Sequence, residues 1–188
     1  LDEPEGPAEE PARDYAPWAG DPRLRALLQL IGGDPIQSVS DGPVPPIVQG
    51  LLRGRRGAPI PAEVPHKYLI FAMHAESTRH IVAGLGAMGL NYALLRGSRQ
   101  NKDEVVQRFK ARDNYGDPLR GSVDILIATS SRDCAGLHLP EVTRLVLYHH
   151  HIVKDIAGQA IGRAQRVGRE YSLEVIELRN EGEAMHFV

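Results

Sequence analysis

The chain has 188 residues, of which 42% are hydrophobic and 24% charged, an ordinary composition for a soluble globular domain. The formal net charge of −2 excludes a global basic field, and the single cysteine excludes an internal disulfide. No signal peptide is visible, and no apolar run approaches the ~20 residues of a membrane span. We therefore expect a reducing intracellular compartment, with nuclear, viral and cytoplasmic sites left open, and no membrane partner. Because the chain starts at Leu1 rather than Met, we expect it to be part of a longer protein.

The N-terminal third contains little apolar periodicity. Residues 1–20 are acidic and rich in proline, which predicts a flexible segment. Residues 1–14 hold six acids and one base, a charge of −5, so of the total −2 the rest of the chain carries about +3. Apolar residues then recur at helical spacing over PRLRALLQLIGG, which predicts a helix that ends at Gly32. Residues 21–66 are read as a helical lead-in and connector, and residues 67–188 as the main domain.

From Lys67 onward, strands and helices alternate. Five short apolar runs predict strands: KYLIFAM, NYALLRG, VDILIAT, TRLVLYH and SLEVIEL. Helices are predicted over ESTRHIVAGLGAMG, with Gly89 as its stop, over RQNKDEVVQRFKA and over DIAGQAIGRAQRV. Strands that are apolar throughout are typical of a parallel sheet with helices on both faces, so the predicted fold class is α/β with a mostly parallel sheet.

Polar loops follow three of these strands. HAES begins at His74, RGSRQ at Arg96 and TSSRD at Thr129. Ligands of parallel sheets bind at the carboxyl ends of the strands, so these loops are expected to share that edge.

The segment DIAGQAIGRAQRVGRE, residues 155–170, carries regularly spaced arginines among alanines and glycines. At about 100° per residue, its apolar side chains form one arc, and Gln159, Arg163 and Arg166 form a neighbouring stripe. Arginine stays charged and offers a planar fork of donors that suits phosphate oxygens. The stripe therefore predicts a polyanion site at the rim of the sheet, with a solvated face of surface ion pairs as the alternative.

QAIGRAQRVGR resembles motif VI of superfamily 2 helicases and translocases, most closely that of the Swi/Snf-type branch. KYLIFAMH is similar to motif IV, YALLRGS to the following strand with its Gly-Ser loop, and DILIATSSRDCAGLHLP to motif V. The resemblance covers roughly residues 67–183. It implies the second, C-terminal RecA-like lobe of the motor, a three-layer domain.

The resemblance also implies roles for individual residues in ATP hydrolysis. In that family ATP and Mg²⁺ bind on the first RecA-like lobe, and the second lobe supplies arginine fingers. It implies Arg166 as the finger, Arg163 beside it on the phosphates, and Gln159 near the γ-phosphate or the attacking water. Gly136 matches the family glycine near the nucleotide. His138 stands where the family has Asp or Asn facing the ribose, and the segment from Thr129 to Gly136 is one residue longer than usual.

On the nucleic-acid side, the resemblance implies contacts with the phosphate backbone from the loops that follow the strands. The implied residues are His74, Arg96, Gly97, Ser98, Thr129, Ser130 and Arg132.

Several patterns are set aside. No lysine follows a glycine anywhere, so the phosphate-binding GxxxxGK[ST] motif of a first lobe is missing from this chain. DEVV, beginning at Asp103, is similar to the acidic metal-binding motif of these motors. That motif follows an apolar strand and DEVV does not, so we expect its acids to lie on a helix surface. HHH, residues 149–151, lacks further residues with metal-ligand spacing, and Cys134 lacks a base partner. No metal site is predicted.

The leading hypothesis is the C-terminal motor lobe of an ATP-dependent DNA helicase or translocase. Its partners would be DNA and the first RecA-like lobe of the same protein, and the chain alone would be inactive. One alternative is a degenerate lobe that binds nucleic acid or protein without ATP turnover. Another is an RNA-directed superfamily 2 motor.

Overall fold

The structure is a computed structural model, and it describes nine parts of the chain. These are residues 21–32, 60–62, 64–110, 121–129, 133–134, 136–149, the single residues 162 and 164, and 171–178.

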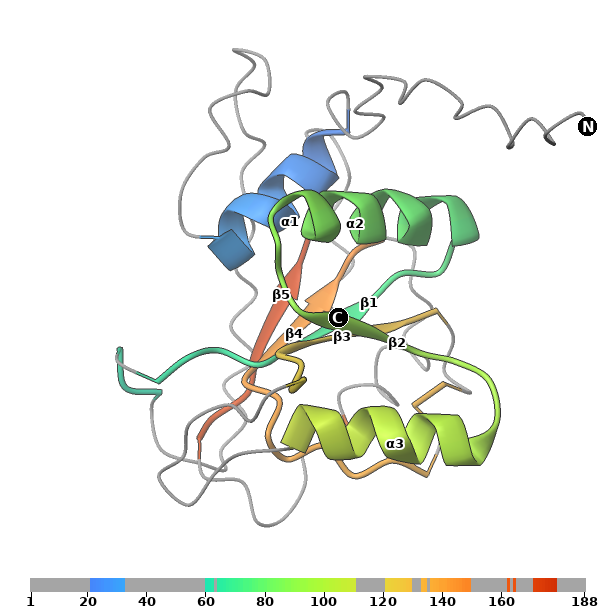
Figure 1. Ribbon diagram of the computed structural model, residues 1–188. Coiled ribbons are helices and arrows are strands. Elements are labelled where there is room, and N and C mark those ends of the chain that lie inside the picture. The colour runs from blue at the N-terminus through green and yellow to red at the C-terminus, as the bar shows by residue number, and fades with distance from the viewer. Residues whose placement is uncertain are drawn as a thin grey trace, which may run out of the picture.

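A five-stranded parallel sheet forms the centre of the domain (Figure 1). The strands run in the order β2-β3-β1-β4-β5, and every neighbouring pair is parallel. All five predicted strands are confirmed: β1 (Tyr68–Phe71), β2 (Tyr92–Leu95), β3 (Ile125–Ala128), β4 (Arg144–Leu147) and β5 (Glu174–Glu177). The predicted α/β class is confirmed, and the sheet is parallel in all its described pairs.

Helices cover both faces of this sheet (Figure 1). Helix α1 (Pro22–Gly32) and helix α2 (Ala75–Ala87) lie on one face, and helix α3 (Arg99–Lys110) lies on the other. All three were predicted at these places. Gly89, with a φ of 67°, follows α2 and takes the left-handed conformation that commonly ends a helix, as predicted.

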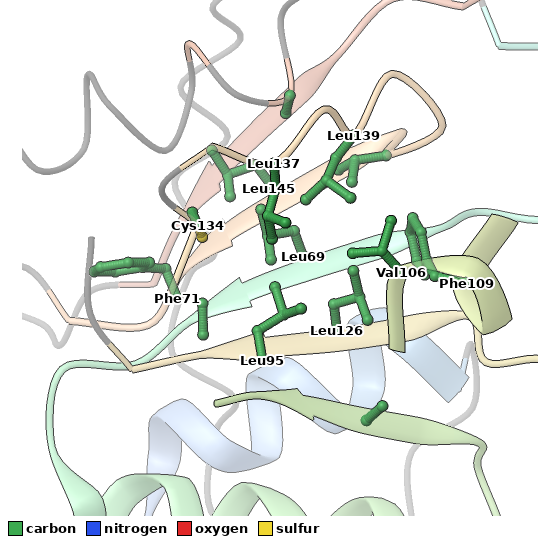
Figure 2. Packing of buried hydrophobic residues seen from close by; sticks show 14 of the residues in the cluster. Leu69, Phe71, Leu95, Val106, Phe109, Leu126, Cys134, Leu137, Leu139 and Leu145 are labelled. Carbon is green, nitrogen blue, oxygen red and sulfur yellow. The ribbon is translucent and has the colours of Figure 1, made fainter. Parts of the chain in front are cut away.

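The two faces of the sheet bury two separate apolar clusters. Successive side chains of a strand point to opposite faces, so Leu69 and Phe71 pack towards α3, and Ile70 towards α1 and α2. Figure 2 shows Val106 and Phe109 of α3 among the side chains of this cluster, near Leu69 and Leu126. Phe71 and Phe109 are both fully buried.

Helix α1 is an integral part of the second cluster. Leu24, Leu27 and Leu28 are at most 1% exposed. A Cβ built on Gly84 of α2 would lie 2.9 Å from the Leu28 side chain, so the two helices meet closely at this glycine. The predicted lead-in therefore begins with a helix that packs on the domain, while the boundary at residue 67 stays a prediction.

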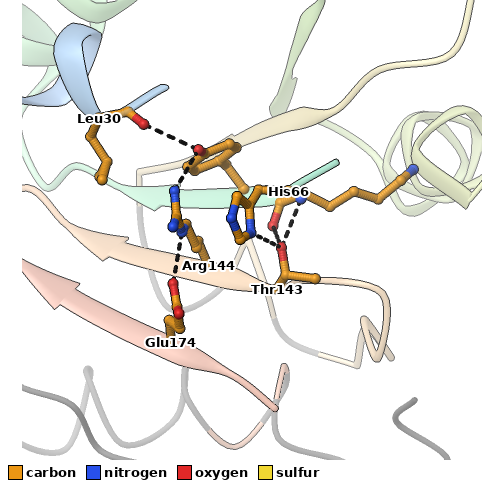
Figure 3. Close-up of polar contacts among 7 residues, drawn as sticks. Leu30, His66, Thr143, Arg144 and Glu174 are labelled. Carbon is orange, nitrogen blue, oxygen red and sulfur yellow. Dashed lines mark hydrogen bonds and ion pairs between the residues drawn. The ribbon is translucent and has the colours of Figure 1, made fainter. Parts of the chain in front are cut away.

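A polar network joins the strands at the amino edge of the sheet, where the strands begin (Figure 3). Arg144 Nε donates to Glu174 at 2.7 Å, and Arg144 Nη1 donates to the Tyr68 hydroxyl, which itself donates to the Leu30 carbonyl of α1. The buried Lys67 ammonium donates to the Phe109 carbonyl at the C-terminal end of α3, where a cation is favourable. The network ties α1 and α3 to the sheet, at the edge away from the predicted site.

Among the helices that the structure describes, none combines the length and the apolar character needed to cross a membrane.

Candidate functional site

The carboxyl edge, where the five strands end, gathers the predicted polar loops. The last residue of β3, Ala128, is paired with the last residues of β2 and β1, and β1 ends beside β4. Along this edge the chain continues as Arg96 after β2, Thr129 after β3, and the segment to His74 after β1. The prediction that these loops share one edge is confirmed for the residues described.

The loop after β2 leads directly into α3. Arg96, Gly97 and Ser98 are all exposed. Gly97 has a φ of 89°, a conformation that favours glycine and that turns the chain from strand to helix. The Ser98 hydroxyl accepts the Asn101 N–H at 3.3 Å and so caps α3. Exposed hydroxyl, guanidinium and backbone N–H groups at a helix start are suited to a phosphate.

Thr129, by contrast, is engaged within the protein. Its backbone N–H and its hydroxyl both donate to one oxygen of Asp133, at 3.0 and 2.8 Å. The other carboxylate oxygen of Asp133 lies 3.4 Å from the ammonium of Lys102 on α3. A nucleic-acid phosphate would have to displace Asp133 to receive these hydrogen bonds, and the phosphate contact of Thr129 stays a prediction.

Asp133 and Lys102 were not predicted as site residues. Asp133 stands four positions after Thr129, and an acid at that distance can fold back onto the N–H and hydroxyl of a strand-end threonine. The four-residue spacing between Thr129 and Asp133 could therefore have indicated this contact from the sequence. The partner Lys102 comes from α3 and could not be identified before the fold was known.

A hollow of about 240 Å³ lies between α3 and the loop that contains Gly136. It is lined by Arg99, Lys102, Asp103, Gly136 and Leu137. Gly136 has a φ of 76° and is exposed, and His138 beyond it is also exposed. Both basic side chains lie near acids, because Arg99 Nε is 3.9 Å from Asp103 and the Lys102 ammonium is 3.4 Å from Asp133. The nucleotide contact of Gly136 and His138 stays a prediction.

His149, just after β4, is a buried polar side chain at this edge. It is 8% exposed. Its Nδ1 accepts the Met73 N–H at 3.1 Å, and its Nε2 lies 3.0 Å from the Ser77 hydroxyl of α2. The ring of the exposed His74 meets it edge-on, with 4.5 Å between the centroids. The first histidine of the HHH run is therefore held by contacts within the protein.

The fold favours the neutral form of His149. Burial, followed by the nearby His74 and Arg23, lowers the pKa of His149 from 6.5 to about 4. A base whose pKa is lowered by folding binds its proton more readily in the unfolded chain. Its contribution to stability is therefore complete above pH 6.5 and is lost as the pH falls towards 4.

We expect the free energy of unfolding to drop by about 2 kcal/mol between pH 7 and pH 5, mostly through His149. Urea denaturation at the two pH values measures this. His149→Asn should remove most of the difference. A smaller slope of the same sign should remain from His66, whose pKa burial and Arg144 also lower. Equal stability of the wild type at both pH values would contradict this assignment.

The arginine stripe lies outside the described residues. Gln159, Arg163 and Arg166 are not described, nor are Ser130 and Arg132. Two residues within the predicted helix are described: Gly162 and Ala164 are helical, Gly162 is exposed, and Ala164 is fully buried in the cluster on the α3 face. This agrees with the predicted arc, in which Ala164 faces the sheet.

The acids of the DEVV run lie on a helix surface, and Cys134 lies in the apolar core. Asp103 and Glu104 lie exposed on α3, as predicted. Cys134 is buried in the cluster on the α3 face (Figure 2). Within the described parts of the chain, no three His, Cys, Asp or Glu side chains are grouped as metal ligands.

Comparison with known proteins shows what this chain is similar to. No protein-family model matches the chain. The chain is 31% identical over 117 residues to "Putative helicase R592" of Acanthamoeba polyphaga mimivirus, a match that covers 62% of this chain. The chain spans 13% of that protein's length.

Two solved structures share the fold. The C-terminal part of the Fun30 ATPase domain has a TM-score of 0.51 at 18% identity, with 62% of this chain and 36% of that chain covered. The C-terminal domain of the DEAD-box protein Dbp5 also has a TM-score of 0.51, at 15% identity, with 85% and 71% covered. The chain therefore shares its RecA-like fold with these two C-terminal domains, and part of its sequence is similar to a helicase.

Proposed function

We propose that this chain is the C-terminal motor lobe of an ATP-dependent DNA helicase or translocase of the Swi/Snf-like group. The observation that carries the proposal is the 31% identity to a mimivirus helicase over 117 residues. The fold shared with the C-terminal part of the Fun30 ATPase domain supports it. ATP with Mg²⁺ binds on the first RecA-like lobe of the same protein, and the present lobe completes the site.

The chemistry assigned to this lobe is charge stabilisation. Phosphoryl transfer depends mainly on positioning and on neutralising the charge of the transferred group. Arg163 and Arg166 supply that charge, and Gln159 positions the γ-phosphate or the attacking water. The burial of Ala164 on the sheet supports this role, because it anchors the segment that carries both arginines. Hydrolysis then depends on closure of the two lobes.

The nucleic-acid backbone lies along the carboxyl edge. Arg96, Gly97 and Ser98 meet one phosphate at the start of α3, where exposed donors converge. His74 is exposed on the next loop but one along the edge. These contacts are with the backbone, so they position the lobe without reading sequence.

A second candidate is a lobe that binds nucleic acid or protein without ATP turnover. Two observations favour it. The exposed His138 stands where the family has an acid or amide at the ribose, and both Thr129 donors are engaged by Asp133.

ATP turnover of the complete protein tests the proposal, measured alone and with duplex DNA, single-stranded DNA or RNA. We expect duplex DNA to stimulate turnover. Stimulation by RNA alone would assign the chain to an RNA-directed motor. Nucleic-acid binding without turnover would favour the second candidate, and this chain alone should bind nucleic acid but hydrolyse no ATP.

A further inference from the structure

The carboxylate of Asp133 is held at the end of β3 in the way that an anionic ligand would be. The Thr129 N–H and hydroxyl donate to one of its oxygens at 3.0 and 2.8 Å, and the Lys102 ammonium lies 3.4 Å from the other. Two neutral donors and one cation therefore meet a single anion. A phosphate group would use the same three donors, because its oxygens also accept from N–H, hydroxyl and ammonium groups.

The ion pair between Lys102 and Asp133 is largely withdrawn from solvent. Their side chains are only 15% and 12% exposed. A charge in such a place is costly unless an opposite charge and hydrogen bonds accompany it. Asp133 supplies an anion for the Lys102 ammonium, and a second anion that took its place would keep the charge of the site balanced.

The site lies next to the loop assigned to the nucleic-acid backbone. The last residues of β2 and β3 are paired, so Arg96 and Thr129 continue from neighbouring strand ends, roughly 5 Å apart. Lys102 stands one turn after Ser98 on α3, and its N–H donates to the Ser98 carbonyl. Lys102 also lines the hollow of about 240 Å³ beside Gly136, which gives a ligand room next to its ammonium.

We propose that Asp133 is a built-in competitor of phosphate: it fills an anion site made by Lys102 and the two Thr129 donors, and a phosphate of the nucleic-acid backbone binds there by displacing it. The inference rests on the proposed function for its ligand, and it adds Lys102 to the binding residues. Phosphate and carboxylate exclude each other, because both are negative and both need the same donors. The affinity of the domain for nucleic acid is then held down by its own aspartate.

A purely structural role of Asp133 makes the opposite prediction. If the carboxylate only ties Thr129 to α3, its removal loosens this edge, and the affinity for nucleic acid falls or stays the same. The loss of one negative charge also favours a polyanion in a general way, and this effect needs a control. Asp103→Asn provides it, because Asp103 lines the same hollow but pairs with Arg99, 3.9 Å away.

The first experiment measures the affinity of this chain for a short DNA duplex and for single-stranded RNA of the same length, at one fixed salt concentration. Asp133→Ala should tighten binding about ten-fold, because a ligand binds less well by the fraction of molecules whose site is open. Asp103→Asn should tighten it about two-fold or less. Thr129→Val should change the wild type little but should remove much of the gain in Asp133→Ala, where its hydroxyl serves the phosphate alone.

A second experiment uses the wild type and so does not depend on how well the variants fold. The chain has three threonines, Thr78, Thr129 and Thr143, so labelling with ¹⁵N-threonine gives three backbone amide signals. Saturating nucleic acid should shift the Thr129 signal, because its N–H exchanges a carboxylate for a phosphate. The Thr143 signal should stay in place, because this residue lies at the amino edge and donates to the Lys67 carbonyl.

Either of two results would overturn the inference. If Asp133→Ala binds both nucleic acids no more tightly than Asp103→Asn does, the carboxylate is not a competitor. If saturating nucleic acid leaves the Thr129 signal unmoved, no phosphate takes the site in the wild type. Neither result touches the proposed function, which is decided by ATP turnover of the complete protein. Absent turnover or a preference for RNA would remove that function and leave the competition at Thr129 standing.

Discussion

Replacing Arg166 by Ala should lower the DNA-stimulated ATP turnover of the complete protein by about 10³-fold or more. The guanidinium is assigned to the charge that develops on the transferred phosphoryl group. DNA binding should be retained, because the backbone contacts are assigned to other residues, such as Arg96 and Ser98. The measurement is steady-state turnover together with DNA affinity at one fixed salt concentration.

Two further variants make this test specific. Arg166→Lys keeps the positive charge but loses the planar fork of donors, so its turnover should fall between those of the wild type and Arg166→Ala. Arg169→Ala removes an arginine of the same segment that lies outside the stripe of Gln159, Arg163 and Arg166, and it should stay within a few-fold of wild type. Equal losses at Arg166 and Arg169 would mean that the segment needs general positive charge rather than a finger.

The elements of the fold were predictable because each strand is a short, continuous apolar run. Runs such as Leu69–Phe71 and Ile125–Ala128 leave no polar face, which requires cover on both sides. Helical spacing likewise located α1 and α3. Strand order was not predictable in this way, because β1 pairs with β3 and β4, whose residues lie more than fifty positions away in the chain.

The candidate site was predictable only where it depends on local sequence. That Arg96 and Thr129 follow strands can be read from the apolar runs and the general rule for parallel sheets. The His149 contacts with Met73 and Ser77 depend on the pairing of β4 with β1, and no spacing within the sequence encodes it. The salt bridge from Lys102 to Asp133 has the same origin, because it joins α3 to a loop that is distant in the chain.

Helix α1 also combines a feature that the local sequence predicts with contacts that depend on the fold. The spacing of its leucines predicted a helix with one apolar face, but not the surface that this face covers. In the structure the face lies on α2 and the sheet, and hydrogen bonds hold both of its ends: Asp21 accepts from Tyr148, and the Leu30 carbonyl accepts from Tyr68. The stability of the domain should therefore depend on residues that precede the predicted boundary at residue 67.

A chain that begins at Lys67 should fail to fold cooperatively, whereas a chain that begins at Asp21 should be as stable as the full chain. Truncation of a fully buried leucine costs about 2–5 kcal/mol, and α1 contributes three leucines that are at most 1% exposed. Their combined loss is comparable with the 5–15 kcal/mol that stabilises a typical domain. Urea denaturation followed by circular dichroism measures the outcome.

Point variants in the full chain separate α1 from the rest of the deleted segment. Leu27→Ala should lower the free energy of unfolding by about 2–5 kcal/mol, because its side chain is 0% exposed between α1 and the sheet. Leu30→Ala, on the half-buried side of the same helix, should cost roughly 1 kcal/mol or less, in proportion to the smaller apolar area removed. If the chain that begins at Lys67 unfolds at the same urea concentration as the full chain, α1 is an independent lead-in, and the domain begins where the sequence alone places it.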